Sequence, residues 1–200
     1  LRASEATLLV DGVEKISHTF GGSVLDGELG VGTKNATAVF DDVTIVPIAS
    51  IPFFENFDSG KSAVISEVAG TWEITGGGRY RAKPLVGVDG LAILQTDTPL
   101  PADLLIESIV RGKDGGSGFG QNGLLIFDYQ GPGDFKYAGF FVASDEGRIG
   151  EFAGGTWTTL ASGVVGSGLL INVDYDVSVE INGADVDLLV DDVLVASHTF

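Results

Sequence analysis

The 200-residue chain carries 28 acidic and 11 basic side chains, a formal net charge of −17, and 44% of its residues are hydrophobic. This charge excludes a nucleic-acid binder, which needs a basic face, and it disfavours docking on anionic membranes, while the hydrophobic content excludes wholesale disorder. The chain contains no cysteine, which excludes disulfides, thiolate zinc sites and cysteine nucleophiles.

The composition also bears on how the chain was produced. It begins at Leu1 and contains no methionine, so we expect a mature piece or a window of a longer protein. It holds no signal peptide and no apolar run of the ~18 residues that a membrane span requires. No membrane insertion is therefore expected. Its 30 glycines predict many tight turns.

Alternating apolar and polar residues predict strands along the whole chain, and no ten-residue segment has a helical period. The sequence therefore predicts an all-β chain of about fourteen strands, folded as an antiparallel two-sheet sandwich. The clearest alternation covers residues 8–20, 37–46, 104–112, 123–130, 135–143, 174–181 and 185–200. Turn signals separate these runs at Asp26-Gly27, Gly76–Gly78, Asp89-Gly90, Asp114–Gly116, Gly131–Gly133 and Asn182-Gly183.

Two segments of the chain repeat each other. LLVDGVEKISHTF (8–20) and LLVDDVLVASHTF (188–200) agree at nine of thirteen positions, at a constant offset of 180 residues. This predicts a parent protein built as a tandem array of modules of that length. With a linker at 49–52, residues 1–48 would be the closing strands of one module, and residues 53–200 the opening bulk of the next.

With these module boundaries, the strands that should close the module of residues 53–200 lie at the N-terminal end of the chain. Residues 21–46, which follow the first SHTF, have no counterpart after Phe200. They can complete their own sandwich as permuted strands, or they can complete a neighbouring copy, which gives head-to-tail strand exchange and a filament. Because residues 1–20 and 181–200 are equivalent, they cannot take one place in a single sandwich. Completion of a neighbour is therefore favoured.

Several segments resemble concanavalin A-like sandwiches. FFENFDSG (53–60), TWEI (71–74) and AVFDDVTIV (38–46) resemble the opening and closing strands of the laminin G-like, MAM-like and family 16 glycoside hydrolase branches. Residues 123–160 resemble the laminin G-like modules of very large secreted bacterial repeat proteins. The resemblance implies a jelly roll that is secreted or at the cell surface, with its first and last strands side by side. The roles it implies are glycan binding, protein binding or structural spacing.

The same resemblance implies a calcium site that ties the first strand to the last. Carried over by motif, the ligands are Glu55, with Asp58 as a further one, and Asp41 or Asp42. Alternation along a strand puts Asp41 and Asp42 on opposite faces, so at most one of them can be a side-chain ligand unless the strand bulges. Calcium takes six to eight oxygen ligands, many of them carboxylates. The alternative is that these acids cap turns and keep an edge strand in water.

Exposed aromatic side chains beside polar neighbours predict a glycan site. The candidates are Trp157, Tyr129, Tyr137 and Tyr80, the last of them flanked by Arg79 and Arg81. The alternative is that aromatic residues at alternating positions form the core. On that interpretation, Phe127, Phe135, Phe141 and Trp72 are buried.

The sequence gives no catalytic fingerprint. The Glu-x-Asp-x-x-Glu string of family 16 hydrolases is absent. The histidines His18 and His198 are repeat equivalents that suggest no Ser-His-Asp relay. Gly118–Gly123 spells GxGxxG, but a strand follows it where a nucleotide site needs a helix. We therefore expect a non-catalytic structural or adhesive module whose partners are copies of itself, with a glycan-binding, lectin-like module as the alternative.

Overall fold

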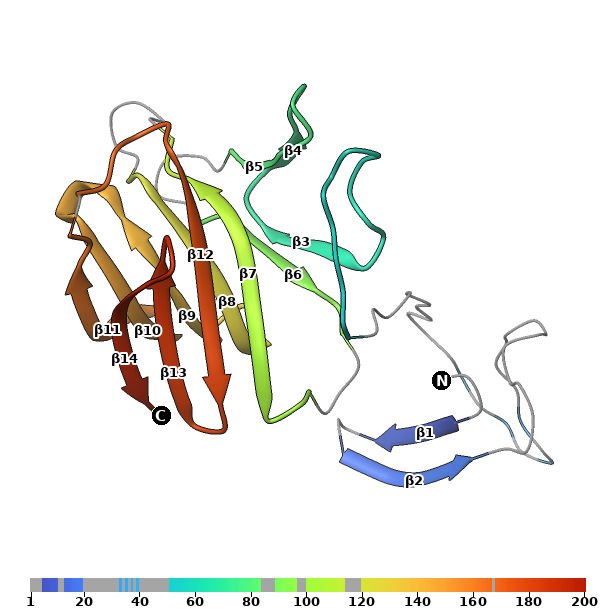
Figure 1. The fold of residues 1–200 in the computed structure, drawn as a ribbon. Helices are drawn as coiled ribbons and strands as arrows, with labels where there is room; N and C mark the ends of the chain where they lie inside the picture. Colours follow the sequence, from blue (N-terminus) through green and yellow to red (C-terminus); the bar gives the residue numbers. More distant parts are fainter. Residues whose placement is uncertain are drawn as a thin grey trace. The chain divides into compact units, whose positions relative to one another are not determined.

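The computed structural model describes residues 5–10, 13–19, 33, 35, 37, 39, 51–83, 89–96, 100–113, 120–166 and 168–200. The chain divides into two units, Leu1–Ile45 and Val46–Phe200, which are described separately below. The described residues form fourteen strands and one short 3-10 turn, Val142–Ser144 (Figure 1). None of their helical segments is long and apolar enough to cross a membrane. The prediction of an all-β, antiparallel fold is confirmed.

The Leu1–Ile45 unit contains one hairpin among its described residues. Strands β1 (Glu5–Val10) and β2 (Val13–Thr19) pair in antiparallel fashion. The register shifts by one residue between Leu8 and Leu9, which marks a β-bulge. The strand predicted over 37–46 and the turn at Asp26-Gly27 lie largely outside the described residues.

The Val46–Phe200 unit is a sandwich of two four-stranded antiparallel sheets (Figure 1). One sheet, here the β8–β11 sheet, has the order β11-β10-β9-β8, and the other, the β7–β14 sheet, has the order β14-β13-β12-β7. Two small antiparallel pairs, β3-β6 and β4-β5, complete the unit. The strands are β3 (Ile65–Ala69), β4 (Trp72–Ile74), β5 (Tyr80–Ala82), β6 (Leu91–Leu94), β7 (Asp103–Arg111), β8 (Asn122–Gly131), β9 (Asp134–Phe141), β10 (Glu146–Ala153), β11 (Thr156–Val164), β12 (Asp174–Asn182), β13 (Asp185–Val190) and β14 (Val193–Thr199).

The core lies between the two sheets and follows from alternation along each strand. Val177 and Val179 on β12 and Leu188 on β13 are at most 1% exposed, and they pack against Phe140 on β9 and Ile149 on β10. The polar residues between them point outward, because successive side chains of a strand face opposite sides. Each such buried side chain contributes about 1.5–3 kcal/mol to folding.

Turn chemistry fixes the hairpins of the sandwich. The predicted turn at Asn182-Gly183 joins β12 to β13, with Gly183 at φ +63°. Asp191 and Asp192 join β13 to β14, both with positive φ, as expected for a two-residue turn that matches the twist of its strands. A further turn at Gly154-Gly155, between β10 and β11, was not among the predicted ones.

The predicted core aromatics divide into two groups. Phe127 and Phe135 are buried, as expected. The same prediction is wrong for Phe141 and Trp72, which are only half-buried. The ring of Phe141 lies 4.3 Å below the Arg148 guanidinium, so this position keeps one face toward a solvated cation.

Candidate functional site

The outer face of the β8–β11 sheet carries a group of aromatic side chains. On β9, Ala138 and Phe140 face the core, so Phe135 and Tyr137 face outward. The strand register places Phe152 of β10 opposite Phe135, and Trp157 of β11 opposite Phe152. Tyr129 of β8 stacks on Phe135. We call these five residues, Tyr129, Phe135, Tyr137, Phe152 and Trp157, the aromatic cluster.

The rings of the aromatic cluster pack closely around Trp157. Its ring centroid lies 4.9 Å from that of Phe152, 5.1 Å from Tyr137 and 5.5 Å from Phe135. The Tyr137 and Phe135 contacts are edge-to-face, with interplanar angles of 68° and 76°. Edge-to-face pairs add about 0.5–1.5 kcal/mol each beyond the area they bury. The indole therefore has a fixed orientation on the sheet.

The members of the aromatic cluster differ in exposure. Trp157 is 39% exposed and Tyr129 is half-buried. Tyr137 is only 2% exposed, and its hydroxyl donates to the Thr158 carbonyl at 3.2 Å. A Cβ added at Gly150 would lie 2.5 Å from that hydroxyl, so the glycine makes room for it. Tyr137 therefore lies beneath Trp157 as a supporting ring with almost no exposed surface, and its place among the glycan-binding candidates stays a prediction.

A carboxylate orients the indole. The Nε1–H of Trp157 donates to Oδ2 of Asp89 at 3.3 Å, and Asp89 is exposed just ahead of β6. The pair presents an apolar ring beside a hydrogen-bond acceptor at the surface. Asp89 is a site residue that sequence reasoning missed, because Asp89-Gly90 stood out only as a turn and 68 residues separate it from Trp157.

Tyr80 belongs to a different stack. Its ring lies 4.6 Å from Trp72 and 5.1 Å from Phe57, nearly parallel to both. The Tyr80 hydroxyl donates to Oε1 of Glu67 at 2.9 Å. Burial raises the pKa of this phenol, and the hydrogen bond to the Glu67 carboxylate raises it further. The structure thus brings together Trp157, Tyr129 and Tyr137, and it places Tyr80 in another group of rings.

The arginine beside Tyr80 has a structural partner. Arg79 donates two hydrogen bonds to Asp174, at 2.6 and 2.9 Å, and Arg111 donates two more, at 2.8 and 2.6 Å. The bonds from Arg111 and then those from Arg79 hold the pKa of Asp174 far below its usual range. These four hydrogen bonds link the loop before β5 to strands β7 and β12.

The predicted calcium ligands are only partly described. Glu55 accepts the backbone N–H of Phe57 at 2.8 Å through one oxygen and that of Ser62 at 2.9 Å through the other. Asp58 accepts the side-chain amide of Asn56 at 3.0 Å. Asp41 and Asp42 lie outside the described residues. Within the described part of the chain, no three acidic, histidine or cysteine side chains gather as a metal site would require, and calcium stays a prediction.

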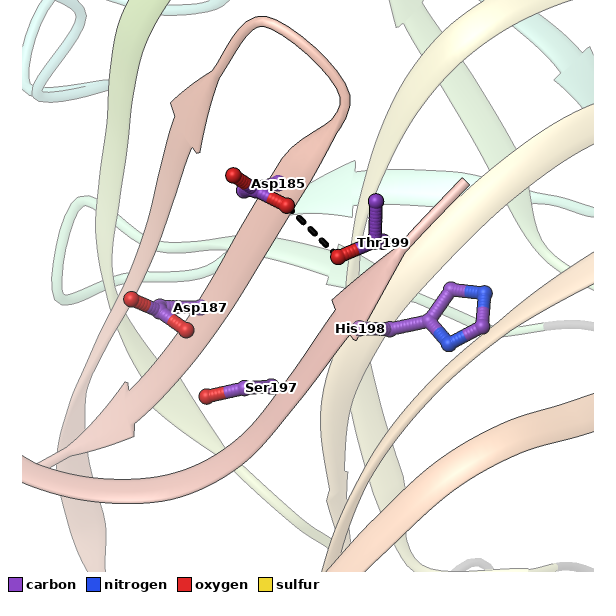
Figure 2. A pocket seen from close by; sticks show the side chains of 5 residues that line it. All are labelled: Asp185, Asp187, Ser197, His198 and Thr199. Carbon is purple, nitrogen blue, oxygen red and sulfur yellow. Dashed lines mark hydrogen bonds between the residues drawn. The ribbon is translucent and has the colours of Figure 1, made fainter.

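Two open depressions lie on the β7–β14 sheet. The second, of about 490 Å³, involves Glu180, Ile181 and Asn182 of β12 and the start of β7. Figure 2 shows the first, of about 420 Å³, in which the His198 imidazole points to the opposite side of β14 from Ser197. These two side chains therefore do not face each other. The first depression is lined by Asp185, Asp187, Ser197, His198 and Thr199.

Comparison with known proteins finds a fold relative among solved structures. No protein-family model and no curated protein matches the chain. Among solved structures, the carbohydrate binding module CBM66 from Bacillus subtilis is similar. It superposes with a TM-score of 0.58 over 77% of this chain and 84% of that chain, at 21% sequence identity. At this identity, the similarity shows a shared β-sandwich fold. The concanavalin A-like and laminin G-like assignment stays a prediction.

Proposed function

We propose that the Val46–Phe200 unit is a non-catalytic carbohydrate-binding module that holds a polysaccharide against Trp157. The observation that carries this proposal is the aromatic cluster, in which a 39% exposed indole is fixed by three other rings and by the Asp89 carboxylate. A further support is the fold relative, CBM66, which is a carbohydrate binding module. The proposal favours the alternative interpretation of the sequence over a purely structural role.

The chemistry of the cluster suits a sugar ring. A sugar has an apolar face of C–H groups, which packs against an indole, and a rim of hydroxyls, which donate to a carboxylate such as that of Asp89. Because packing already fixes Trp157, little conformational entropy is lost when a ligand binds. The net charge of −17 repels polyanions, so neutral polysaccharides are the ligands we expect.

The proposal places the module outside the cell, because the polysaccharides that it would bind are found there. A structural or adhesive role in a tandem-repeat protein, with head-to-tail strand exchange through residues 21–46, is a second proposal. It draws support from the equivalence of the two hairpins, which is taken further below.

Binding to a panel of soluble neutral and anionic polysaccharides tests the carbohydrate proposal. We expect the full chain to bind at least one neutral polysaccharide, and Trp157→Ala to lose at least tenfold in affinity. Phe54→Ala is the matched control, because it removes an 86% exposed aromatic ring outside the cluster. Wild-type affinity in Trp157→Ala, or an absence of binding across the panel, would contradict the proposal.

A further inference from the structure

The hairpin β1–β2 is a structural copy of β13–β14. Its register pairs Ala6 with His18 and Leu8 with Ile16, while the other hairpin pairs Val186 with His198 and Leu188 with Ala196. Every paired position is shifted by 180 residues, and both hairpins carry their bulge at the equivalent place, after Leu8 and after Leu188. The sequence repeat is therefore also a repeat of backbone geometry.

In the Val46–Phe200 unit, this hairpin closes the sandwich. Its inward pair, Leu188 and Ala196, is 0% and 8% exposed. Two glycines, one on β10 and one on β11, leave the space that the hairpin fills. A Cβ at Gly147 would lie 2.7 Å from Val195 and 3.0 Å from Leu188, and a Cβ at Gly163 would collide with the Val195 carbonyl oxygen. We call this surface of β10 and β11 the hairpin seat.

In the Leu1–Ile45 unit, the same pair is uncovered. Leu8 is 55% exposed and Ile16 is 61% exposed, although the equivalent side chains of β13–β14 are buried. A two-stranded hairpin alone is at best marginally stable in water, so an apolar face of this kind requires a partner. Because the hairpin is a geometric copy, the seat of a second sandwich supplies the shape that it fits.

We propose that β1–β2 is an exchangeable closing hairpin: when β13–β14 of a second copy of this chain has left its seat, β1–β2 docks there, with Leu8 and Ile16 in the places of Leu188 and Ala196. The inference does not depend on carbohydrate binding. It also differs from strand exchange through residues 21–46, because the exchanged segment is the hairpin itself, which packs on the seat and pairs with β12 as β13 does.

Two sequence differences decide which hairpin holds a given seat. Lys15 stands where β14 has Val195, a half-buried position at the edge strand, so the lysine stem packs there while its ammonium group reaches water. Ile16 stands where β14 has Ala196, and the extra volume at this tight position is unfavourable. The resident β13–β14 hairpin therefore prevails in its own chain. The β1–β2 hairpin of a second copy takes the seat once the resident hairpin has left it.

The test uses Leu188→Asp in the full chain to displace the resident β13–β14 hairpin from the seat. This substitution places a charge at a fully buried position. We expect this variant to associate with rising concentration in sedimentation velocity, and to keep hydrogen-exchange protection on β10 and β11. The double variant Leu188→Asp/Leu8→Asp should remain monomeric and lose that protection. Leu188→Asp/Val13→Asp is the matched control and should behave like Leu188→Asp, because the equivalent Val193 is 62% exposed even in the closed sandwich.

Two results would overturn the inference: indistinguishable behaviour of Leu188→Asp and Leu188→Asp/Leu8→Asp, or a protected Leu188→Asp monomer, which would mean closure within one chain. If Leu188→Asp does not fold, a graft decides. In the full chain, residues 185–199 are replaced by the sequence of residues 5–19. We expect one cooperative unfolding transition, with Tm lowered by roughly 10 °C because of the altered packing. Loss of the cooperative transition would refute the fit of β1–β2 to the seat.

Discussion

Single side chains divide the work of the candidate site between contact and support. Trp157 offers its indole to the surface, while Tyr137, at 2% exposure, fixes it from below. Asp89 holds the indole N–H and leaves acceptor capacity toward solvent, since a carboxylate can accept several hydrogen bonds. The contribution of Asp89 is therefore measurable separately from that of the ring.

Asp89→Asn should weaken polysaccharide binding about fivefold, because a hydrogen bond to a charged acceptor becomes a neutral one at a cost of about 1 kcal/mol. Stability should change little, since Asp89 is exposed. Isothermal titration with the best ligand of the panel measures the affinity, and thermal unfolding supplies the control. An affinity equal to that of the wild type would show that Asp89 does not reach the ligand.

Asp174 makes the clearest pH-dependent contribution to stability. Its folded-state pKa is depressed by Arg111 and Arg79, so the carboxylate stabilises the fold above the unfolded-state pKa of about 3.9, and this contribution is lost as pH falls below that value. Since Asp174 is 35% exposed, we expect Asp174→Asn to cost about 1 kcal/mol at pH 7, or roughly 3 °C in Tm.

The measurement for Asp174 is a series of thermal melts between pH 7 and pH 2. The gap in Tm between wild type and Asp174→Asn should narrow below about pH 4, where protonation removes the charge in the wild type. Asp176→Asn, an exposed position on the same strand, serves as control. A difference in Tm that stays constant over the whole range would show that the charge of Asp174 does not contribute to stability.

At the level of elements, the sequence predicts strands and turns better than it predicts the site. Alternation located β12 and β13, and Asn182-Gly183 located the turn between them, because both signals depend only on neighbouring residues. The aromatic cluster depends on the register of four strands, which sets Trp157 beside Phe152 and Phe152 beside Phe135. No local pattern encodes that register, and hence Trp157, Tyr129 and Tyr137 could be named as aromatics but not as neighbours.

The two hairpins allow one substitution to be compared in two settings. Leu188→Asp should destabilise the sandwich by about 4 kcal/mol or more, because it buries an unpaired charge in the core. Leu8→Asp, at the equivalent and 55% exposed position, should change the free energy of unfolding by no more than about 0.5 kcal/mol. Chemical denaturation of both single variants makes the comparison. A large loss for Leu8→Asp would mean that its hairpin is already packed against a partner.

At the scale of the whole molecule, the chain combines a β-sandwich unit with a second hairpin, β1–β2, that has the same strand pairing as β13–β14 of the sandwich. The fold relative shows that a chain only 21% identical builds a similar sandwich, so the architecture constrains the sequence weakly. The similarity of residues 8–20 and 188–200 is visible in the sequence, and the two hairpins that contain these segments share their strand register. That Leu188 is buried while the equivalent Leu8 is exposed could not follow from the sequence, because the two segments carry the same pattern.

Calcium binding at Glu55 stays a prediction, and it can be tested through the stability of the chain. Glu55 uses each oxygen for one backbone N–H, which leaves acceptor capacity on both for a cation. If Glu55 and either Asp41 or Asp42 share an ion, calcium binds only the folded state and stabilises it by mass action, by about 2.7 kcal/mol at a hundredfold excess over Kd.

We expect a chelator to lower Tm by several degrees and millimolar calcium to restore it, as read by differential scanning calorimetry. Glu55→Gln should abolish the calcium-dependent part of Tm, which separates metal binding from the loss of the two backbone hydrogen bonds. A Tm that does not respond to calcium in the wild type would mean that these acids serve only to cap turns and solvate an edge strand.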